Sequence, residues 1–181
     1  MTAKELMTAS MRAIDFDDIQ LLRYWRNLDH VNQRMAIQDY INRDGQRKWF
    51  AQLNNETVKY FIFSLGMKDI GCATLTKINI EEKTVEGGVF CGDVHYLKHW
   101  INIWACLKIY DYAFFELKLD TAYATILTDN KAALSLNKSL GYTFIKHADE
   151  NVGRFALKRG EYISKSKKIR RYLNDFARQS I

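Results

Sequence analysis

The sequence predicts one domain of the α/β class, in which strands and helices alternate along the chain. A length of 181 residues with 48% hydrophobic residues suits a single globular domain with a sizeable core. Runs whose apolar residues recur at every second position are interleaved with runs of helical period. Three of the strand-like runs are joined by short polar connections, which predict an antiparallel meander. We therefore expect residues 1–181 to form a single domain.

The first half of the chain predicts one strand, two helices and the meander. Residues 11–15 fit a first strand, and residues 21–27 and 43–53 fit two helices, the second with Trp49, Phe50 and Leu53 on or near its buried face. The meander follows as three strand-like runs, which are residues 60–63, 70–80 and 85–91. Gly66 and Gly92 are turn signals at two of their ends.

The second half predicts two further helices separated by a strand, and then two more strands. Residues 102–117 form a strong helical pattern, because apolar residues recur at steps of four and three. Residues 121–127 alternate as a strand. The next helix can be capped at Asp129 and Asn130 and ends at Gly141. Strands near residues 142–146 and 154–158 complete the order β-α-α-β-β-β-α-β-α-β-β before the C-terminal segment.

The C-terminal segment, residues 160–181, reads as a basic amphipathic helix. From Lys158 onward, eight Lys or Arg face two Asp or Glu, which accounts for the whole net charge of +6. Apolar residues recur there at helical spacing, so we expect a docked helix with a solvated basic face. Those residues are Ile163, Ile169, Tyr172, Leu173 and Phe176. A nucleic-acid or membrane-surface helix is the alternative, but we expect no nucleic-acid partner.

Hydropathy and cysteine usage indicate a cytoplasmic protein. No apolar run approaches the roughly 20 residues that span a bilayer, and the N-terminus lacks the apolar core of a signal peptide. We therefore expect no membrane span. Cys72, Cys91 and Cys106 form an odd set in apolar surroundings, which fits buried free thiols better than disulfides.

A polar residue on an apolar helix face is the most informative functional feature. Asn137 shares a face with Ala133, Leu136 and Leu140 on the helix that precedes Gly141. The pattern N-x-x-A-x-x-x-N-x-x-x-G-Y, from Asn130 to Tyr142, resembles the late motif of the GNAT superfamily of acyl-CoA-dependent N-acyltransferases. That resemblance implies a mixed central sheet of about seven strands flanked by helices, with acetyl-CoA as co-substrate. It also implies that this helix lies beside the thiol arm of coenzyme A, next to a splayed strand.

The N-terminal part resembles a narrower group. The pattern W-R-N…V…M…I…W-F…L, which starts at Trp25, is similar to that of the N-acetyltransferases of pseudaminic acid biosynthesis, which act on the 4-amino group of a UDP-linked dideoxy sugar. The resemblance implies a substrate site built from Arg26, Asn27, His30, Met35, Tyr40 and Lys77. Without the resemblance, Arg26 reads as the partner of an acid and Asn27 as a helix cap.

The expected pyrophosphate loop departs from the family pattern. Family members usually carry glycines where this chain has residues 98–105, KHWINIWA. Free backbone N–H groups at a helix N-terminus bind phosphate, so we expect Lys98 and Asn102 to compensate for the missing glycines. The resemblance implies a cofactor site that contains Val89, Cys91, Gly92, Lys98, His99, Trp100, Asn102, Asn130, Ala133 and Asn137.

Glu86 and Asn137 are the expected catalytic residues. Glu86 lies on the strand that borders the expected acetyl group, and partial burial there would raise its pKa and let it accept a proton from a substrate ammonium. An exposed strand glutamate is the alternative. Asn137 stands where many family members have a proton-donating tyrosine, and asparagine cannot donate a proton near neutral pH. We therefore expect Asn137 to orient the thioester, as in the similar ribosomal-protein alanine acetyltransferases. The alternative is an asparagine paired with nearby backbone.

Two other kinds of site are conceivable around Cys91, a zinc site and a nucleophile with its base. Cys91, His95 and His99 are spaced four residues apart, which on a helix would align three zinc ligands, and Cys91 with His95 could form a nucleophile and base. Because Cys91 ends a strand and no fourth ligand or orienting group can be named, we expect no metal and no covalent mechanism.

The sequence therefore predicts an acetyl-CoA-dependent N-acetyltransferase. By resemblance, the acceptor is the primary amine of a nucleotide-linked amino-dideoxy sugar used for surface glycan or flagellin glycosylation. The alternative enzyme acetylates a protein N-terminus or another small amine. A non-catalytic CoA-binding regulatory protein is the alternative of another class. A monomer or homodimer is expected.

Overall fold

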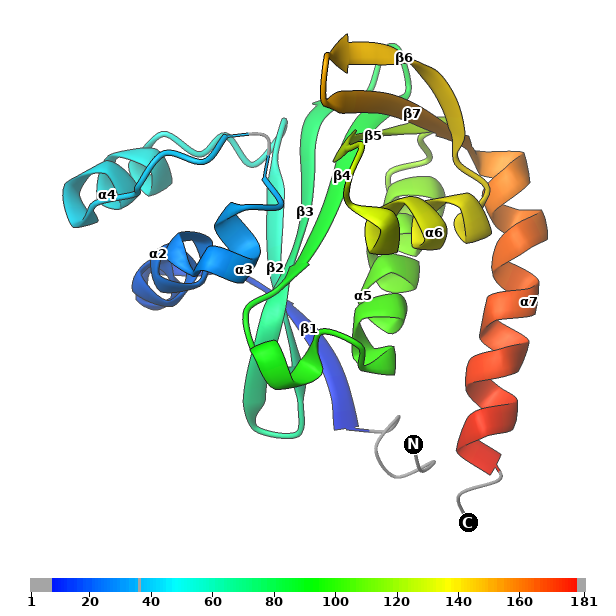
Figure 1. Ribbon diagram of the computed structural model, residues 1–181, viewed down its shortest axis with the longest axis horizontal. Coiled ribbons are helices and arrows are strands. Elements are labelled where there is room, and N and C mark those ends of the chain that lie inside the picture. The colour runs from blue at the N-terminus through cyan, green and yellow to red at the C-terminus, as the bar shows by residue number, and fades with distance from the viewer. Residues whose placement is uncertain (1–7, 36, 179–181) are drawn as a thin grey trace.

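The computed structural model describes residues 8–35 and 37–178, with side chains as far as residue 175, and confirms the α/β prediction (Figure 1). Its elements are β1 (Ala9–Ala13), η1 (Phe16–Asp18), α2 (Ile19–Asn27), α3 (Asp29–Asn32), α4 (Arg43–Ala51), β2 (Lys59–Leu65), β3 (Lys68–Asn79), β4 (Thr84–Cys91), η2 (Val94–Tyr96), α5 (Trp100–Asp111), η3 (Tyr112–Glu116), β5 (Thr121–Leu127), α6 (Lys131–Leu140), β6 (Thr143–Asp149), β7 (Val152–Lys158) and α7 (Arg159–Arg178).

One mixed sheet of seven strands organises these elements. The strand order is β1-β2-β3-β4-β5-β7-β6. Strands β2 to β4 form the expected antiparallel meander, and β1 pairs antiparallel with β2. Strands β4 and β5 are parallel, and β7 pairs antiparallel with both β5 and β6. The last strand in sequence is therefore inserted between β5 and β6.

Helices cover both faces of the sheet and divide the core. Helices α2, α3 and α4 lie on one side, and α5, α6 and α7 lie on the other (Figure 1). The larger cluster of buried side chains lies between the sheet and α5, and includes Phe63, Leu75 and Ile109. A smaller cluster on the opposite face joins Trp25 of α2 to Ile62 of β2.

Several element ends differ from the sequence expectation for local reasons. The first strand spans residues 9–13, because Asp15 caps the short helix η1 through the N–H of Asp17. Helix α5 starts at Trp100, where Nδ1 of His99 accepts from the N–H of Ile101, and a π-helical turn follows it from Tyr112. Helix α3 was not expected. Helix α6 follows the expectation, and its C-cap Gly141 has a φ of 104°, which favours glycine.

Helix α7 docks as expected, but through a face that differs from the predicted one. Tyr162 is fully buried, and its hydroxyl donates to the carbonyl oxygen of Leu107 at 2.8 Å. Leu173 is also buried, whereas Ile163 and Tyr172 are 37% and 64% exposed. The predicted apolar face was therefore wrong at these two positions, because the docking face follows the spacing of Tyr162. The side chain of Phe176 lies outside those described.

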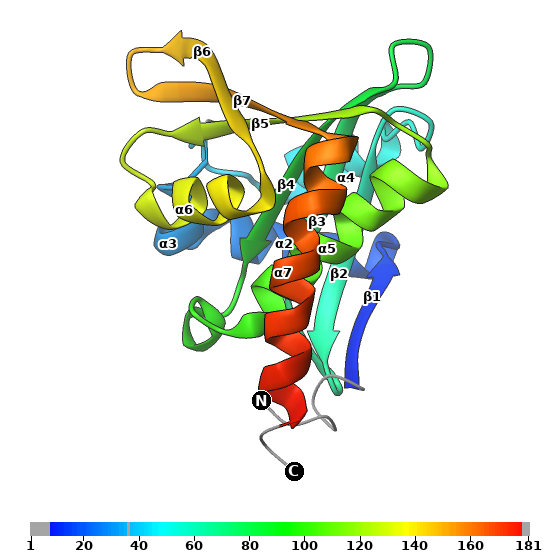
Figure 2. The same cartoon turned by 90° about the vertical axis from the view of Figure 1, so that its right-hand side faces the viewer.

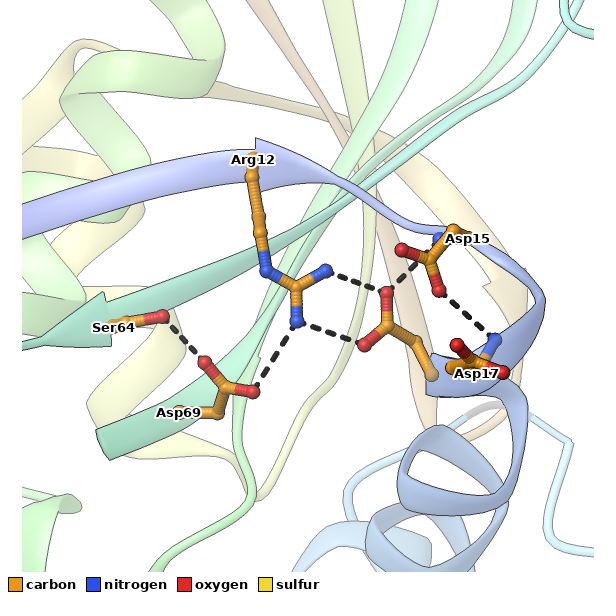
Figure 3. Close-up of polar contacts among 6 residues, drawn as sticks. Arg12, Asp15, Asp17, Ser64 and Asp69 are labelled. Atoms are coloured by element: carbon orange, nitrogen blue, oxygen red, sulfur yellow. Dashed lines mark hydrogen bonds and ion pairs between the residues drawn. The ribbon is translucent and has the colours of Figure 1, made fainter. Parts of the chain in front are cut away.

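An ion-pair network fixes the first strand to the entry of α2 (Figure 3). Arg12 donates from both terminal nitrogens to Asp18, at 2.6 and 2.8 Å, and also contacts Asp69 at 3.3 Å. Ser64 donates to the other oxygen of Asp69 at 2.6 Å. The hydrogen bond from Arg12 lowers the pKa of Asp18 below its ordinary value of 3.8. The network joins β1, β2, β3 and η1, which leads into α2.

We expect Arg12→Ala to lower the free energy of unfolding by about 1–3 kcal/mol, because the largely buried Asp18 carboxylate loses its bidentate partner. The network contribution is fully present above the ordinary Asp18 pKa of 3.8 and declines as pH falls through the lower folded value. Urea unfolding at pH 7 and at decreasing pH measures both effects. Arg171→Ala, which breaks an exposed pair with Asp175, is the matched control and should change stability by less than about 0.5 kcal/mol. Equal effects of the two substitutions would contradict the assignment.

Candidate active site

The sheet opens where β4 and β5 diverge. Their parallel register covers only three pairs, Thr84 with Thr121, Val85 with Ala122 and Glu86 with Tyr123. Beyond these pairs β4 continues to Cys91 and β5 to Leu127, and Figure 2 shows the two strands separating. Backbone groups on the facing edges are therefore not paired across this gap. Such an edge can bind an extended ligand that carries amide groups.

Glu86 stands at the divergence point. One of its carboxylate oxygens accepts from Thr125 Oγ1 at 2.9 Å, and the other accepts from Lys77 Nζ at 2.7 Å. Burial raises the pKa of Glu86, but these hydrogen bonds and the charges of Lys77 and Arg154 lower it more, so the net pKa lies below its ordinary value. The raised pKa expected from the sequence is wrong, because a cation and a hydroxyl hold the carboxylate in its charged form.

Lys77 is placed by an irregularity in the sheet. The β3–β4 register shifts between Thr76 and Asn79, and Lys77 has a φ of 51° there. This left-handed conformation is uncommon for residues other than glycine, asparagine and aspartate. The bulge brings the Lys77 ammonium to the Glu86 carboxylate. The unfavourable backbone conformation of Lys77 therefore coincides with a specific ion pair.

The two asparagines of helix α6 and its N-cap bond to nearby backbone. Oδ1 of Asn130 accepts from the N–H of Ala133 at 3.2 Å, which is the predicted cap. Nδ2 of Asn137 donates to the carbonyl oxygen of Ala133 at 2.8 Å. Asn137 is half-buried, and the amide nitrogen that was expected to contact the thioester is therefore bonded to backbone.

The segment between β4 and α5 differs from the expected open turn. The amides of His95, Tyr96 and His99 already donate within the segment. Nδ2 of Asn102 donates to the carbonyl oxygens of Tyr96 and His99, at 2.6 and 3.1 Å, so Asn102 closes the loop instead of presenting a free amide to phosphate. Lys98 is exposed.

Two polar atoms in this segment are buried without a hydrogen-bond partner, Nε1 of Trp100 and Oδ1 of Asn102. Buried polar groups nearly always form hydrogen bonds. At this end of α5, the indole N–H of Trp100 and the side-chain oxygen of Asn102 could therefore each form a further hydrogen bond.

Trp25 packs closely against the backbone at the end of β4. The N–H of Gly92 donates to the carbonyl oxygen of Ile70 at 2.8 Å, and a Cβ at Gly92 would lie 2.3 Å from the ring of Trp25. Val89 packs partly buried against the core on the α5 side. Gly92 therefore allows Trp25 to lie directly on the backbone, and its amide is not free for a cofactor.

Cys91 has the properties of a structural thiol. Its Sγ donates to the carbonyl oxygen of Asp93 at 3.1 Å, and burial raises its pKa. A thiolate nucleophile needs the opposite shift. His95 lies in η2 and His99 caps α5, so the three residues do not share one helix. In the described part of the chain, no three His, Cys, Asp or Glu side chains gather as metal ligands.

The expected substrate residues of α2 have different environments. Burial lowers the pKa of Arg26, and within the described residues its guanidinium contacts no carboxylate, only the carbonyl oxygen of Ile37 at 3.4 Å. Asn27 accepts from the N–H of Ile41 at 2.9 Å and donates to its carbonyl oxygen at 2.8 Å. Asn27 therefore clamps the segment before α4, whereas Arg26 keeps donors for a ligand.

The other expected substrate residues are spread around this face. Nε2 of His30 lies 3.3 Å from the carbonyl oxygen of Cys91, which ties α3 to the end of β4. Met35 is half-buried, and Tyr40 is 74% exposed. The structure thus brings Lys77 to Glu86 but leaves Tyr40 in solvent.

Several residues around Glu86 were not singled out from the sequence. A cavity of about 370 Å³ beside Glu86 and Lys77 is also lined by Tyr123, Lys146 and Arg154. The guanidinium of Arg154 lies over the Tyr123 ring, 4.7 Å from its centroid. Their positions depend on the insertion of β7 between β5 and β6, which no local sequence pattern reveals.

Comparisons with known proteins agree with this architecture. Residues 9–143 match the family model described as acetyltransferase (GNAT) domain. The chain is 28% identical over 149 residues to acetyltransferase PseH of Campylobacter jejuni, covering 82% of this chain and 90% of the relative. A crystal structure of Campylobacter jejuni N-acetyltransferase PseH has a TM-score of 0.64 and 20% identity, covering 84% of this chain and 99% of that one.

A second solved structure with this architecture is a polyamine acetyltransferase. Spermidine N-acetyltransferase from Vibrio cholerae, in complex with CoA and spermine, has a TM-score of 0.80 and 17% identity, covering 87% of this chain and 99% of that one. In the described part of the chain, none of the helices has both the length and the apolar character needed to cross a membrane.

Proposed function

Because the chain belongs to the GNAT acetyltransferase family, we propose that it transfers acetyl from acetyl-CoA to the primary amine of a nucleotide-linked amino-dideoxy sugar. The observation that carries this proposal is the charged Glu86 carboxylate at the divergence of β4 and β5, beside a cavity of about 370 Å³. That volume falls in the range of small-molecule sites. The N-terminal sequence pattern and the similarity to acetyltransferase PseH support a sugar amine as the acceptor.

Each group near the gap has a role in this proposal. Acetyl-CoA supplies an activated thioester when it is bound. The open edge of β4 beyond Glu86 offers backbone groups to the pantetheine arm and N–H donors to a carbonyl oxygen that gains negative charge. Glu86 holds the acceptor ammonium and takes its proton directly or through water. The neutral amine would then form the new C–N bond at the thioester carbonyl while the C–S bond breaks, and CoA would leave as a thiolate that takes a proton from solvent. Asn137 orients the thioester with the second N–H of its side-chain amide, and Lys98, which precedes α5, contacts the pyrophosphate.

A small polyamine is the second candidate acceptor. The fold is shared with spermidine N-acetyltransferase at a TM-score of 0.80, although 17% identity supports the fold alone. A carboxylate such as Glu86 suits either acceptor, because both present an ammonium group.

Acceptor specificity can be measured directly. We expect the purified chain to release CoA thiol with acetyl-CoA and a UDP-linked 4-amino-4,6-dideoxy sugar, and the sugar nucleotide to gain the mass of one acetyl group. The same sugar nucleotide already acetylated at the amine is the matched control. Turnover of spermidine but not of the sugar would establish the second candidate. CoA binding without turnover of any acceptor would contradict catalysis.

A further inference from the structure

Two cations face each other directly across strands β6 and β7. Lys146 and Arg154 are Cα partners in the antiparallel register of these strands, and both line the cavity beside Glu86. Among the described residues, neither has a carboxylate within 4.0 Å. Like charges at directly opposed positions destabilise a strand pair. An anion between them would remove this repulsion.

The guanidinium of Arg154 is held in a position suited to such an anion. It lies over the ring of Tyr123, with 4.7 Å between the guanidinium carbon and the ring centroid. A guanidinium held over a ring keeps those N–H groups that point away from the ring available, and guanidinium N–H groups match two phosphate oxygens. Tyr123 itself is fixed in the last paired position between β5 and β4.

Charged side chains of both signs lie along one strip across the sheet. Arg154 of β7 is the register partner of Thr125 in β5, and Thr125 donates to Glu86 of β4, which accepts from Lys77. The cavity therefore has a carboxylate at the divergence of β4 and β5, and an unpaired cationic pair on the β6–β7 side. An acceptor that carries both an amine and a negative group satisfies both ends at once.

We propose that Lys146 and Arg154 form a phosphate subsite that holds the diphosphate of the acceptor while its amine lies at Glu86. This inference rests on the proposed function, because it assigns the diphosphate of that acceptor to particular residues. It also gives a specificity rule. A polyamine that enters the same cavity meets the positive charges of Lys146 and Arg154, so the subsite favours sugar nucleotides over spermidine.

Calorimetric titration with UDP, without acetyl-CoA, tests the subsite independently of turnover. We expect Arg154→Gln and Lys146→Gln each to weaken UDP binding by roughly tenfold or more, and Arg154→Lys to have an intermediate effect because it keeps charge but loses the planar fork. UDP should also raise the melting temperature of the unsubstituted chain more than that of either variant. Arg159→Gln, which removes the same charge outside the cavity, is the matched control and should bind UDP normally.

The outcomes separate the subsite from the proposed function. If UDP binds in an Arg154-dependent way but no sugar nucleotide is acetylated, the subsite stands and the proposed acceptor is wrong. If the sugar nucleotide is acetylated with an unchanged KM in both variants, the function stands and the subsite is wrong. UDP binding that is weakened equally by Arg159→Gln would reflect overall charge and would also overturn the subsite.

Discussion

Replacement of Glu86 by glutamine should lower kcat/KM at neutral pH by roughly 100-fold, the size expected when a positioned general base is lost. Glutamine keeps the shape of the side chain but cannot accept a proton or balance an ammonium. The pKa of Glu86 is lowered in the folded chain, so the carboxylate stays ionised throughout the neutral range. The deficit of the variant should therefore shrink as rising pH deprotonates the acceptor amine. Initial rates across a pH series, with a verified acceptor, measure this.

The neighbouring acid provides a matched control for this experiment. Glu82 also lines the cavity but is exposed, so Glu82→Gln should change kcat/KM by less than about threefold if Glu86 acts by its contact with the amine. Thr125→Val removes one hydrogen bond to the carboxylate and should have an intermediate effect of roughly threefold to tenfold. A pH-independent deficit in Glu86→Gln would contradict the base role and leave Glu86 as a binding group.

Gly92→Ala should lower the free energy of unfolding by about 1–3 kcal/mol, as expected for overpacking a tight contact. A Cβ at this position would lie 2.3, 2.4 and 2.5 Å from three atoms of the Trp25 ring. Trp25 is buried, so the clash has to move α2 away from the end of β4. Thermal unfolding measures the loss, which for a chain of this size corresponds to several degrees in Tm. The acceptor KM should rise as well, because Arg26 follows Trp25 on the same helix.

Gly160→Ala is the control for this substitution. A Cβ at Gly160 meets nothing within 4 Å, and the residue lies in the first turn of α7. Alanine favours a helix over glycine, so this variant should be unchanged or more stable by up to about 1 kcal/mol. Equal destabilisation by both substitutions would show that the Trp25 contact is not what Gly92 provides.

Local patterns in the sequence were sufficient for most elements of this fold. The helix that ends at Gly141 could be bounded because its cap and its left-handed C-terminal residue are local signals. The bounds of β5 could be predicted as well, because the alternation of side chains over residues 121–127 is also a local signal. The docking face of α7 was harder to predict, because Tyr162 and Tyr172 are equally amphipathic in sequence and only the position of α5 decides which is buried.

The site was less predictable than the fold, for a physical reason. The environment of Glu86 depends on Lys77 at a bulge and on Thr125 from another strand, and neither contact follows from residue type. Lys146 and Arg154 come together with Tyr123 only through the register of three strands. Asn27 looked like a ligand-binding amide, but its bonds to Ile41 depend on where the chain returns before α4.

The insertion of β7 between β5 and β6 has a consequence for biosynthesis. On a nascent chain, β5 and β6 leave the ribosome before β7, which lies between them in the sheet. The edges of β5 and β6 that pair with β7 therefore have no partner until residues 152–158 have been synthesised. Unpaired strand edges are the part of a partly folded chain most prone to pair with other molecules. Arg154 arrives with this strand, so the proposed phosphate subsite is incomplete until β7 has been synthesised.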